Sequence, residues 1–285
     1  MKSIIGFRWI LIFAGLLVFA GACNDDDADD TTDEDINSSS VLTDLEGREI
    51  TVAVENAYPP FNYFNAETGE GEGWDYDILA ELCERLNCVP MFVPMLWETT
   101  LETVGRGDID MIASGVVITD ERDRIVDFSD SNASAYQYLF VRNNESRFSG
   151  AGDISEGDYV IAAQADTVNS EKAGELVGDE RVITFPILGD AVAAVVNGEA
   201  DAFIHLLREG QELTGQGADQ VMIAGEPLAQ LDYGFVFSEG SDLVAAFNEA
   251  IAALKADGTF HELDEQYFGP SFSLTPEDTI PPTYG

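Results

Sequence analysis

Residues 107–122 hold the groups best suited to chemistry in this chain of 285 residues. Their pattern predicts a short buried strand, a turn of small residues at Ser114 and Gly115, and then a helix. Backbone N–H groups near Ser114 and Val117 would then face open space, and Arg122 would bring a guanidinium to the same place. Free N–H groups and a two-pronged cation suit a carboxylate. Alternatively, Arg122 pairs with a neighbouring aspartate on a solvated surface, and this segment favours neither interpretation.

The elements before this segment alternate between strand and helix. Apolar spacing predicts strands over 49–54 and 89–93 and helices over 75–86 and after residue 97. This order indicates a parallel sheet with right-handed crossovers, in which ligands bind at the carboxyl ends of the strands. Five side chains follow such ends and therefore favour a ligand site there: Glu55, Tyr58, Trp97, Ser114 and Arg122.

A second strand–helix unit is predicted over 159–204, and Gly107-x-x-Asp110 recurs in it as Gly198-x-x-Asp201. This weak internal repeat predicts two similar α/β lobes, with both aspartates forming hydrogen bonds near the start of a strand. Apolar strands would carry the chain between the lobes twice, so that a ligand lies in a cleft beside a hinge. The expected boundaries are lobe I over 44–139 and 231–270, lobe II over 140–230, and an exposed tail over 271–285.

The N-terminus carries the features of a secretion signal. A positively charged start and an apolar run ending in small residues predict a signal peptide over 1–22. The residues before Cys23 resemble the lipobox of secreted lipoproteins, which predicts that a lipid on Cys23 anchors the extracytoplasmic chain to the membrane surface; an ordinary cleaved signal is the alternative. Residues 24–40 hold eight acids and almost nothing apolar, so we expect 23–43 to be a disordered tether.

Composition excludes several classes of partner. The chain has 54 acidic residues against 13 lysines and arginines, a formal net charge of −41, so phosphate repulsion excludes nucleic acid.

Cys83 and Cys88 would form a disulfide in an oxidising compartment if Asn87 adopts a left-handed cap. Two thiols are too few for a metal site, and we expect neither a metal nor a cofactor.

Several short motifs, taken in order, resemble the extracytoplasmic solute-binding proteins of ABC amino-acid importers, the family 3 type. The resemblance covers about residues 48–270 and rests on Tyr58-Pro-Pro-Phe61, Gly107-Asp-Ile-Asp-Met-Ile, Ile118-Thr-Asp-Glu-Arg122 and Gly198-Glu-Ala-Asp-Ala, among others. It implies a two-lobed periplasmic-binding-protein fold of the α/β class. Each lobe would be a mostly parallel sheet flanked by helices, and two hinge strands would join the lobes.

The resemblance also implies a role for each residue of the cleft. Arg122 and Thr167 would hold the α-carboxylate, Glu55 would read a cationic side chain, Tyr58 and Trp97 would wall the ligand, and Ser114 and Gly115 would offer backbone groups.

This sequence departs from the family pattern where the α-ammonium is usually held. Leu206 stands in place of an aspartate, and Val117 in place of a hydroxyl residue. The lobe II signature reads Gln164-Ala-Asp166-Thr167. Because a desolvated ammonium needs partners, either Asp166, Glu55 or His205 supplies them, or the solute lacks a standard α-ammonium.

The leading hypothesis is a non-enzymatic, monomeric lipoprotein that closes on a small solute and docks on an ABC permease. One alternative is an enzyme like the periplasmic cyclohexadienyl dehydratases, with Glu55, Asp166 or His205 as general acid. Another is a sensory lipoprotein that presents its ligand to a receptor.

Overall fold

The computed structural model describes residues 42–208, 211, 213, 217–275, 277–282 and 284. The predicted signal peptide, Cys23 and most of the predicted acidic tether lie outside these residues. None of the helices in the described part of the chain is both long and apolar enough to cross a membrane.

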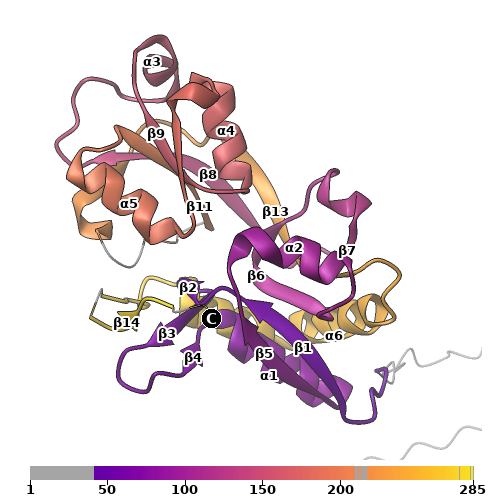
Figure 1. The fold of residues 1–285 in the computed structure, drawn as a ribbon. Helices are drawn as coiled ribbons and strands as arrows, with labels where there is room; N and C mark the ends of the chain where they lie inside the picture. Colours follow the sequence, from indigo (N-terminus) through magenta and orange to yellow (C-terminus); the bar gives the residue numbers. More distant parts are fainter. Residues whose placement is uncertain are drawn as a thin grey trace, which may run out of the picture. The chain divides into compact units, whose positions relative to one another are not determined.

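The central feature of the fold is a ten-stranded sheet that both halves of the chain share (Figure 1). Its order is β10-β9-β11-β8-β13-β6-β1-β5, with β12 beside β8 and β7 beside β13. Strands β5, β1 and β6 run parallel, as do β10, β9 and β11, whereas β8 and β13 are antiparallel to their neighbours. The two parallel groups are the two predicted strand–helix units, which confirms the two-lobed α/β fold. The strands are β1 (Arg48–Val54), β5 (Cys88–Pro94), β6 (Met111–Val117), β7 (Val126–Phe128), β8 (Ala133–Arg142), β9 (Ile161–Gln164), β10 (Val182–Phe185), β11 (Ala202–Arg208), β12 (Val221–Ile223) and β13 (Ala229–Ser238).

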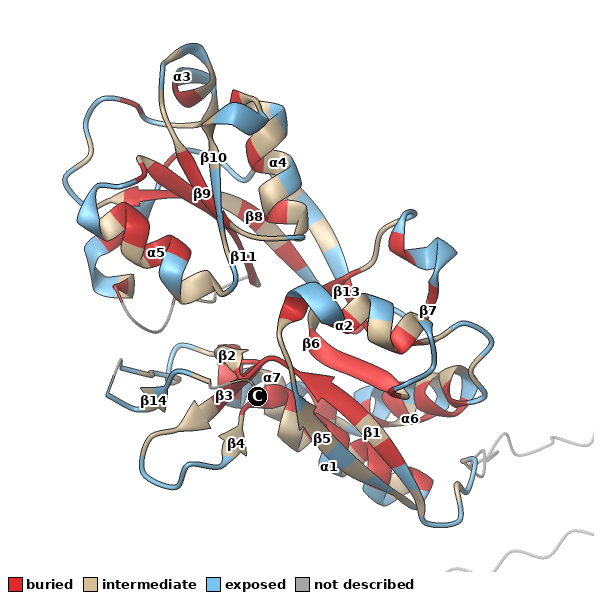
Figure 2. Cartoon of the chain, viewed as in Figure 1, coloured by how far each residue is buried: buried red, intermediate tan, exposed pale blue. Residues whose placement is uncertain are grey.

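Helices cover both faces of the half built from β1, β5 and β6. One apolar core joins this sheet to α1 (Trp74–Leu86), α6 (Leu243–Asp257) and α7 (Thr259–Phe268), and α2 (Trp97–Gly105) covers a smaller core. Figure 2 shows β6 buried along nearly its whole length. Such burial is typical of a parallel strand covered on both faces.

Helix α1 ends at the residue for which the sequence suggests a left-handed cap. Asn87 has φ 52° and ψ 57°, which lets the chain reverse into β5. The Cα atoms of Cys83 and Cys88 consequently lie 4.6 Å apart, and their sulfur atoms are bonded.

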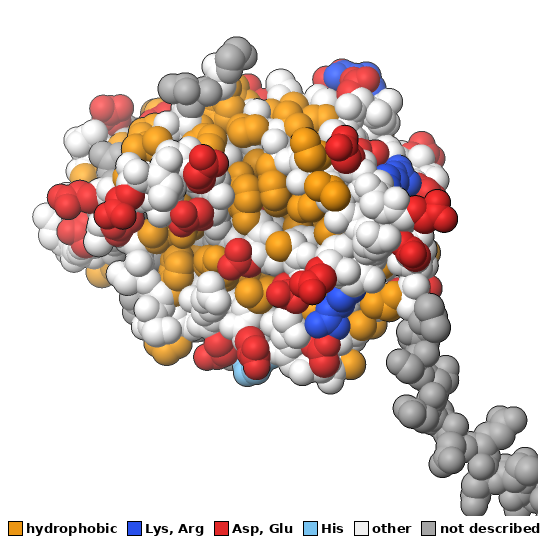
Figure 3. All heavy atoms as spheres, turned by 90° about the horizontal axis from the view of Figure 1, so that it is seen from below, with side chains coloured by type: hydrophobic (Ala, Val, Ile, Leu, Met, Phe, Trp, Pro, Cys, Tyr) orange, Lys and Arg blue, Asp and Glu red, His pale blue; other side chains and the backbone are white. Residues whose placement is uncertain are grey.

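The other half packs β9, β10 and β11 against three helices in two further apolar cores. The helices are α3 (Ala151–Glu156), α4 (Val168–Val177) and α5 (Leu188–Asn197). Acidic side chains are spread over the face of the molecule seen in Figure 3, where lysines and arginines are few, in keeping with the net charge of −41.

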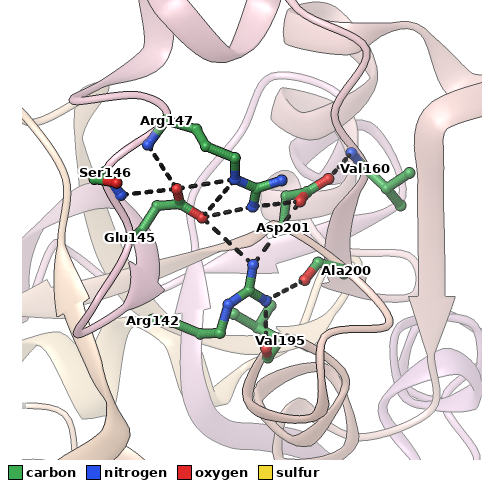
Figure 4. A network of polar contacts seen from close by, with 8 residues as sticks. All are labelled: Arg142, Glu145, Ser146, Arg147, Val160, Val195, Ala200 and Asp201. Atoms are coloured by element: carbon green, nitrogen blue, oxygen red, sulfur yellow. Dashed lines mark hydrogen bonds and ion pairs between the residues drawn. The ribbon is translucent and has the colours of Figure 1, made fainter.

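The two aspartates of the internal repeat have matching structural roles. Asp110 Oδ2 accepts a hydrogen bond from the backbone N–H of Thr51 at 2.8 Å, and Asp201 Oδ2 accepts one from that of Val160 at 2.9 Å. Each carboxylate therefore ties the start of its strand to the next strand, which confirms the structural interpretation. Figure 4 shows that Asp201 also belongs to a polar network with three neighbours: Arg142, Glu145 and Arg147.

Two strands connect the halves, as the sequence predicts, and a third, β11, contacts both halves. β8 and β13 cross between them and pair with each other, as expected. β11 stays paired with β8 as far as Arg208 opposite Ala135, and its Leu206 belongs to the apolar core around α1. Arg208 then forms a two-pronged ion pair with Asp264 of α7, at 2.9 and 2.5 Å. The end of β11 therefore contacts lobe I, although the expected boundaries assign it to lobe II.

The last residues form part of a second, smaller sheet. β14 (Thr279–Ile280) pairs with β3 (Asn62–Asn65), which also pairs with β2 (Ala57–Tyr58) and β4 (Gly71–Glu72). The hydroxyl of Tyr284 donates a hydrogen bond to the backbone oxygen of Glu55 at 2.6 Å. The described residues of the expected tail are exposed or half-buried, but the segment pairs with β3 and returns to the end of β1.

Candidate ligand-binding site

A cavity of about 40 Å³ lies at the carboxyl ends of β1, β6 and β9, between the two halves of the sheet. It brings together ten of the eleven residues that the sequence predicts to bind a ligand, and Asp166 is the exception. Its lining consists of Glu55, Tyr58, Trp97, Ser114, Gly115, Val116, Val117, Arg122, Gln164, Thr167, Val168, Asn169, His205 and Leu206.

Arg122 lies in a single turn of 3₁₀ helix over 122–124, shorter than the helix that the sequence predicts. The turn stops there because the chain continues into β7, which pairs with β13. Arg122 is only 8% exposed, its Nη1 donates to the backbone oxygen of Val117 at 2.9 Å, and its guanidinium carbon lies 5.1 Å from the ring centroid of Trp97. A solvated surface pair does not fit this burial.

The charge of Arg122 is incompletely compensated. Burial lowers the pKa of the guanidinium, and within the described part of the chain no carboxylate forms an ion pair with it. A guanidinium carries five N–H donors, and a desolvated charge without a counterion is costly. An anion in the cavity would offset this cost.

The N-terminus of α4 lines the same cavity through Thr167, Val168 and Asn169. The Thr167 hydroxyl donates to the backbone oxygen of Gln164 at 2.8 Å and accepts from the backbone N–H of Ser170 at 3.2 Å. This hydroxyl is therefore committed to capping the helix, whereas the first turn of α4 lines the cavity, where its unpaired N–H groups and its dipole would favour an anion. The carboxylate contact that the resemblance implies for Thr167 would come from this helix end.

Glu55 follows the last residue of β1 and is 5% exposed. Its Oε1 accepts a hydrogen bond from Nε2 of Gln164, at the end of β9, at 2.5 Å. Burial raises the pKa of the carboxyl group to about 8, although the bond from Gln164 opposes the shift. Glu55 and Gln164 thus link the two halves across the cavity.

Tyr58 and His205 form an aromatic wall, with ring centroids 5.5 Å apart in an edge arrangement. Burial lowers the pKa of His205 to about 3, so the imidazole is neutral at pH 7. Burial also raises the pKa of Tyr58, whose hydroxyl lies 3.2 Å from that of Tyr233. This wall supplies apolar surface and no charge.

Asp166 lies outside the cavity lining, which corrects the prediction for this residue. Its side chain is exposed, because its backbone takes the left-handed conformation at φ 56° just before the helix cap. Only its carbonyl takes part, accepting a hydrogen bond from Nε1 of Trp97 at 2.8 Å. This bond is a second polar link between the halves.

Ser114 and Gly115 shape the floor of the cavity. The Ser114 hydroxyl oxygen accepts hydrogen bonds from the backbone N–H of Glu55 at 3.3 Å and from Nδ2 of Asn62 at 2.9 Å. Gly115 has φ +53°, and a Cβ there would approach the ring of Tyr58 to 3.1 Å. Glycine is therefore required for this close approach.

Asn169 is a site residue that sequence reasoning missed. It is 8% exposed, and its Oδ1 accepts a hydrogen bond from Nε2 of Gln137 in the hinge strand β8 at 2.9 Å. Its place in the first turn after the Thr167 cap was the available signal, since the first turn of α4 faces the cavity.

Among the described residues, no group of three or more histidine, cysteine, aspartate or glutamate side chains could hold a metal ion. Two α/β lobes, hinge strands and a cavity with a buried guanidinium together define a cleft-type solute-binding protein. The sequence matches the bacterial extracellular solute-binding proteins, family 3, over residues 50–270, and the chain belongs to this family.

Individual relatives share about a quarter of their residues with this chain. The ABC transporter glutamine-binding protein GlnH of Bacillus subtilis is 25% identical over 273 residues, which are 94% of this chain and 97% of the relative. The L-cystine-binding protein TcyJ of Escherichia coli is 27% identical over 222 residues, 77% of this chain and 82% of the relative. The crystal structure of the arginine-, lysine-, histidine-binding protein ArtJ from Geobacillus stearothermophilus has a TM-score of 0.69 at 25% identity and covers 78% of this chain and 96% of ArtJ.

Proposed function

We propose that this extracytoplasmic chain captures a small carboxylate-bearing solute, an amino acid or a related zwitterion, and delivers it to an ABC importer. Arg122 carries the proposal, because a buried guanidinium with no carboxylate partner among the described residues lines a cavity that the N-terminus of α4 also faces. Relatives named for glutamine, cystine and basic amino acids support the amino-acid class.

We also propose a hinge motion between the two lobes, whose boundaries are those predicted from the sequence. Contacts from both lobes to one solute would favour the closed form, and the closed form would dock on the permease. We further propose that the protein acts as a monomer and that a lipid on Cys23 holds it at the membrane surface.

Calorimetric titration with the twenty standard amino acids and cystine tests the proposal. We expect Arg122→Ala to weaken the tightest interaction by about 100-fold or more, because a charge-assisted two-pronged contact is lost. Arg122→Lys should recover only part of the affinity, since it keeps the charge without the fork. Arg124→Ala, an exposed arginine in the same 3₁₀ turn, is the matched control and should bind normally. Equal binding by the Arg122→Ala and Arg124→Ala variants would refute the carboxylate role.

One observation favours a second function, a dehydratase with a general acid in the cleft. The pKa of Glu55 is raised to about 8 by burial, so its carboxyl group is mostly protonated at neutral pH and could donate a proton. The protein would then convert prephenate or arogenate to an aromatic product, which absorbance would detect. Product formation that disappears in Glu55→Gln would establish this function in place of simple binding.

A further inference from the structure

The cavity contains one fixed cation and one ionisable acid. Arg122 is the arginine of the lining, and Glu55 is the carboxyl residue; His205 is neutral because its pKa is lowered to about 3. The two positions where a polar partner for an ammonium would be expected are apolar, since Val117 and Leu206 are 3% and 4% exposed and both line the cavity. The exposed side chain of Asp166 contributes no acid.

We propose that Glu55 pairs with the single ammonium group of the solute, and that the site therefore selects net-neutral zwitterions. The inference rests on the proposed function, since Arg122 would hold the carboxylate. Charge counting disfavours the neighbouring classes: a solute with two cations would leave one of them unpaired in the cavity, and a plain carboxylate would leave Glu55 protonated and would lack the ion pair with it. The unpaired second cation should weaken binding by about 100-fold or more.

Pairing with an ammonium also couples binding to a proton. The carboxyl group of Glu55 accepts a hydrogen bond from Gln164 of β9, and the titratable groups that interact with its charge are Tyr58 of β2 and Tyr284 of the last segment. Arg122 lines the same cavity but forms no ion pair with Glu55. Burial therefore keeps the pKa of Glu55 near 8 in the absence of a cation, and an ammonium would lower it. Binding at pH 7 should release about 0.9 proton, and affinity should rise by up to about tenfold per pH unit until the pH reaches the pKa.

Two sets of matched probes test the selection. The larger set is L-norleucine, L-lysine and hexanoate, which share a carbon skeleton and carry one, two and no ammonium groups; the smaller set is L-alanine and propionate, which carry one and none. We expect the zwitterion to give the largest rise in melting temperature at equal concentration within each set that binds. A larger effect of lysine or hexanoate would overturn the inference while leaving the carboxylate site intact. Silence of both sets would count against the proposed function itself.

Two variants test whether Glu55, and not Asp166, is responsible for the selection of zwitterions. Glu55→Gln keeps a side chain of the same size beside Gln164, and we expect it to bind hexanoate at least as well as norleucine, because the ammonium then lacks a partner, and to abolish proton release. Proton release is read from titrations in phosphate and Tris buffers, whose ionisation enthalpies differ, and wild-type protein alone gives this readout if the variant folds poorly. Asp166→Asn removes the exposed acid at the cleft edge and should change nothing. Loss of selection in Asp166→Asn, or its retention in Glu55→Gln, would overturn the inference.

Discussion

Asp75 is a carboxyl group almost completely enclosed in the core of lobe I. Its Oδ2 accepts a hydrogen bond from Nδ2 of Asn62 at 2.7 Å, and Oδ1 has no partner among the described groups. Burial raises the pKa of Asp75 to about 8, so the folded protein holds a proton that the unfolded chain releases above pH 4. Its contribution to stability is therefore largest at low pH and is lost as the pH rises from about 4 to about 8.

Asp75→Asn should remove this dependence. We expect the wild type to lose at most about 1.4 kcal/mol of unfolding free energy per pH unit through this group, and the variant to lose less between pH 6 and pH 8.5. Urea unfolding at several pH values measures the difference. Glu55 has a shift of the same sign, so some dependence should remain in Asp75→Asn and shrink further when Glu55→Gln is added. Parallel pH profiles for the wild type and Asp75→Asn would contradict the prediction.

For single residues, the sequence predicts a position in the cleft correctly where the end of a strand determines that position. Glu55 and Gln164 lie in the cavity because they lie at the carboxyl end of a parallel strand, whereas Ser114, for which the sequence predicts a turn, lies within β6. The prediction for Asp166 was wrong because the direction of its side chain depends on a backbone angle. The residue takes the left-handed conformation just before the α4 cap, and its side chain points outward. Side-chain orientation in a two-residue loop depends on such angles, which composition and periodicity do not reveal.

Helix α4 depends on its cap, and the cap also lines the cavity. Thr167 and Ser170 exchange side-chain and backbone hydrogen bonds in a capping box. Thr167→Ala should cost about 1 kcal/mol of unfolding free energy, because one helix donor loses its acceptor, whereas Thr167→Ser should cost much less. Thermal or urea unfolding without solute measures both. If the hydroxyl bound the solute directly, Thr167→Ala would instead reduce affinity strongly and leave stability nearly unchanged.

The longer elements were predictable because each has its own apolar period, as in α1 and β6. The exceptions depend on partners far away in the chain. The expected helix at residue 122 is cut to one turn because β7 must pair with β13, and β14 forms only because β3 offers it an edge. The length over which β11 pairs with β8 likewise depends on the partner strand and cannot be predicted from a local sequence pattern.

For the whole molecule, the pair between Arg208 and Asp264 is a contact that joins the lobes away from the cavity. The side chains are 12% and 22% exposed, and Asp264 Oδ1 also accepts from Nε1 of Trp74 at 2.9 Å. The guanidinium carbon lies 4.1 Å from the ring centroid of Phe268. A partly buried, two-pronged pair of this kind is weakly screened by salt and well oriented. It fixes the end of β11 against α7. Leu206, which lines the cavity, lies two residues earlier in the same strand and is therefore held in place as well.

Asp264→Asn should therefore loosen the lobes as well as lower stability. We expect a loss on the order of 1–3 kcal/mol in unfolding free energy, together with a larger radius of gyration by small-angle scattering. In the proposed hinge motion the closed form binds solute, so a smaller closed fraction should weaken the affinity for the tightest amino acid in the same proportion. The control is Glu102→Gln, which breaks an exposed pair with Arg106 within α2 and should alter neither lobe separation nor affinity. An Asp264→Asn variant that lost stability but kept the radius of gyration and the affinity of the wild type would contradict the prediction. The ion pair would then be a local contact of α7, and lobe separation would depend on the paired hinge strands β8 and β13 alone.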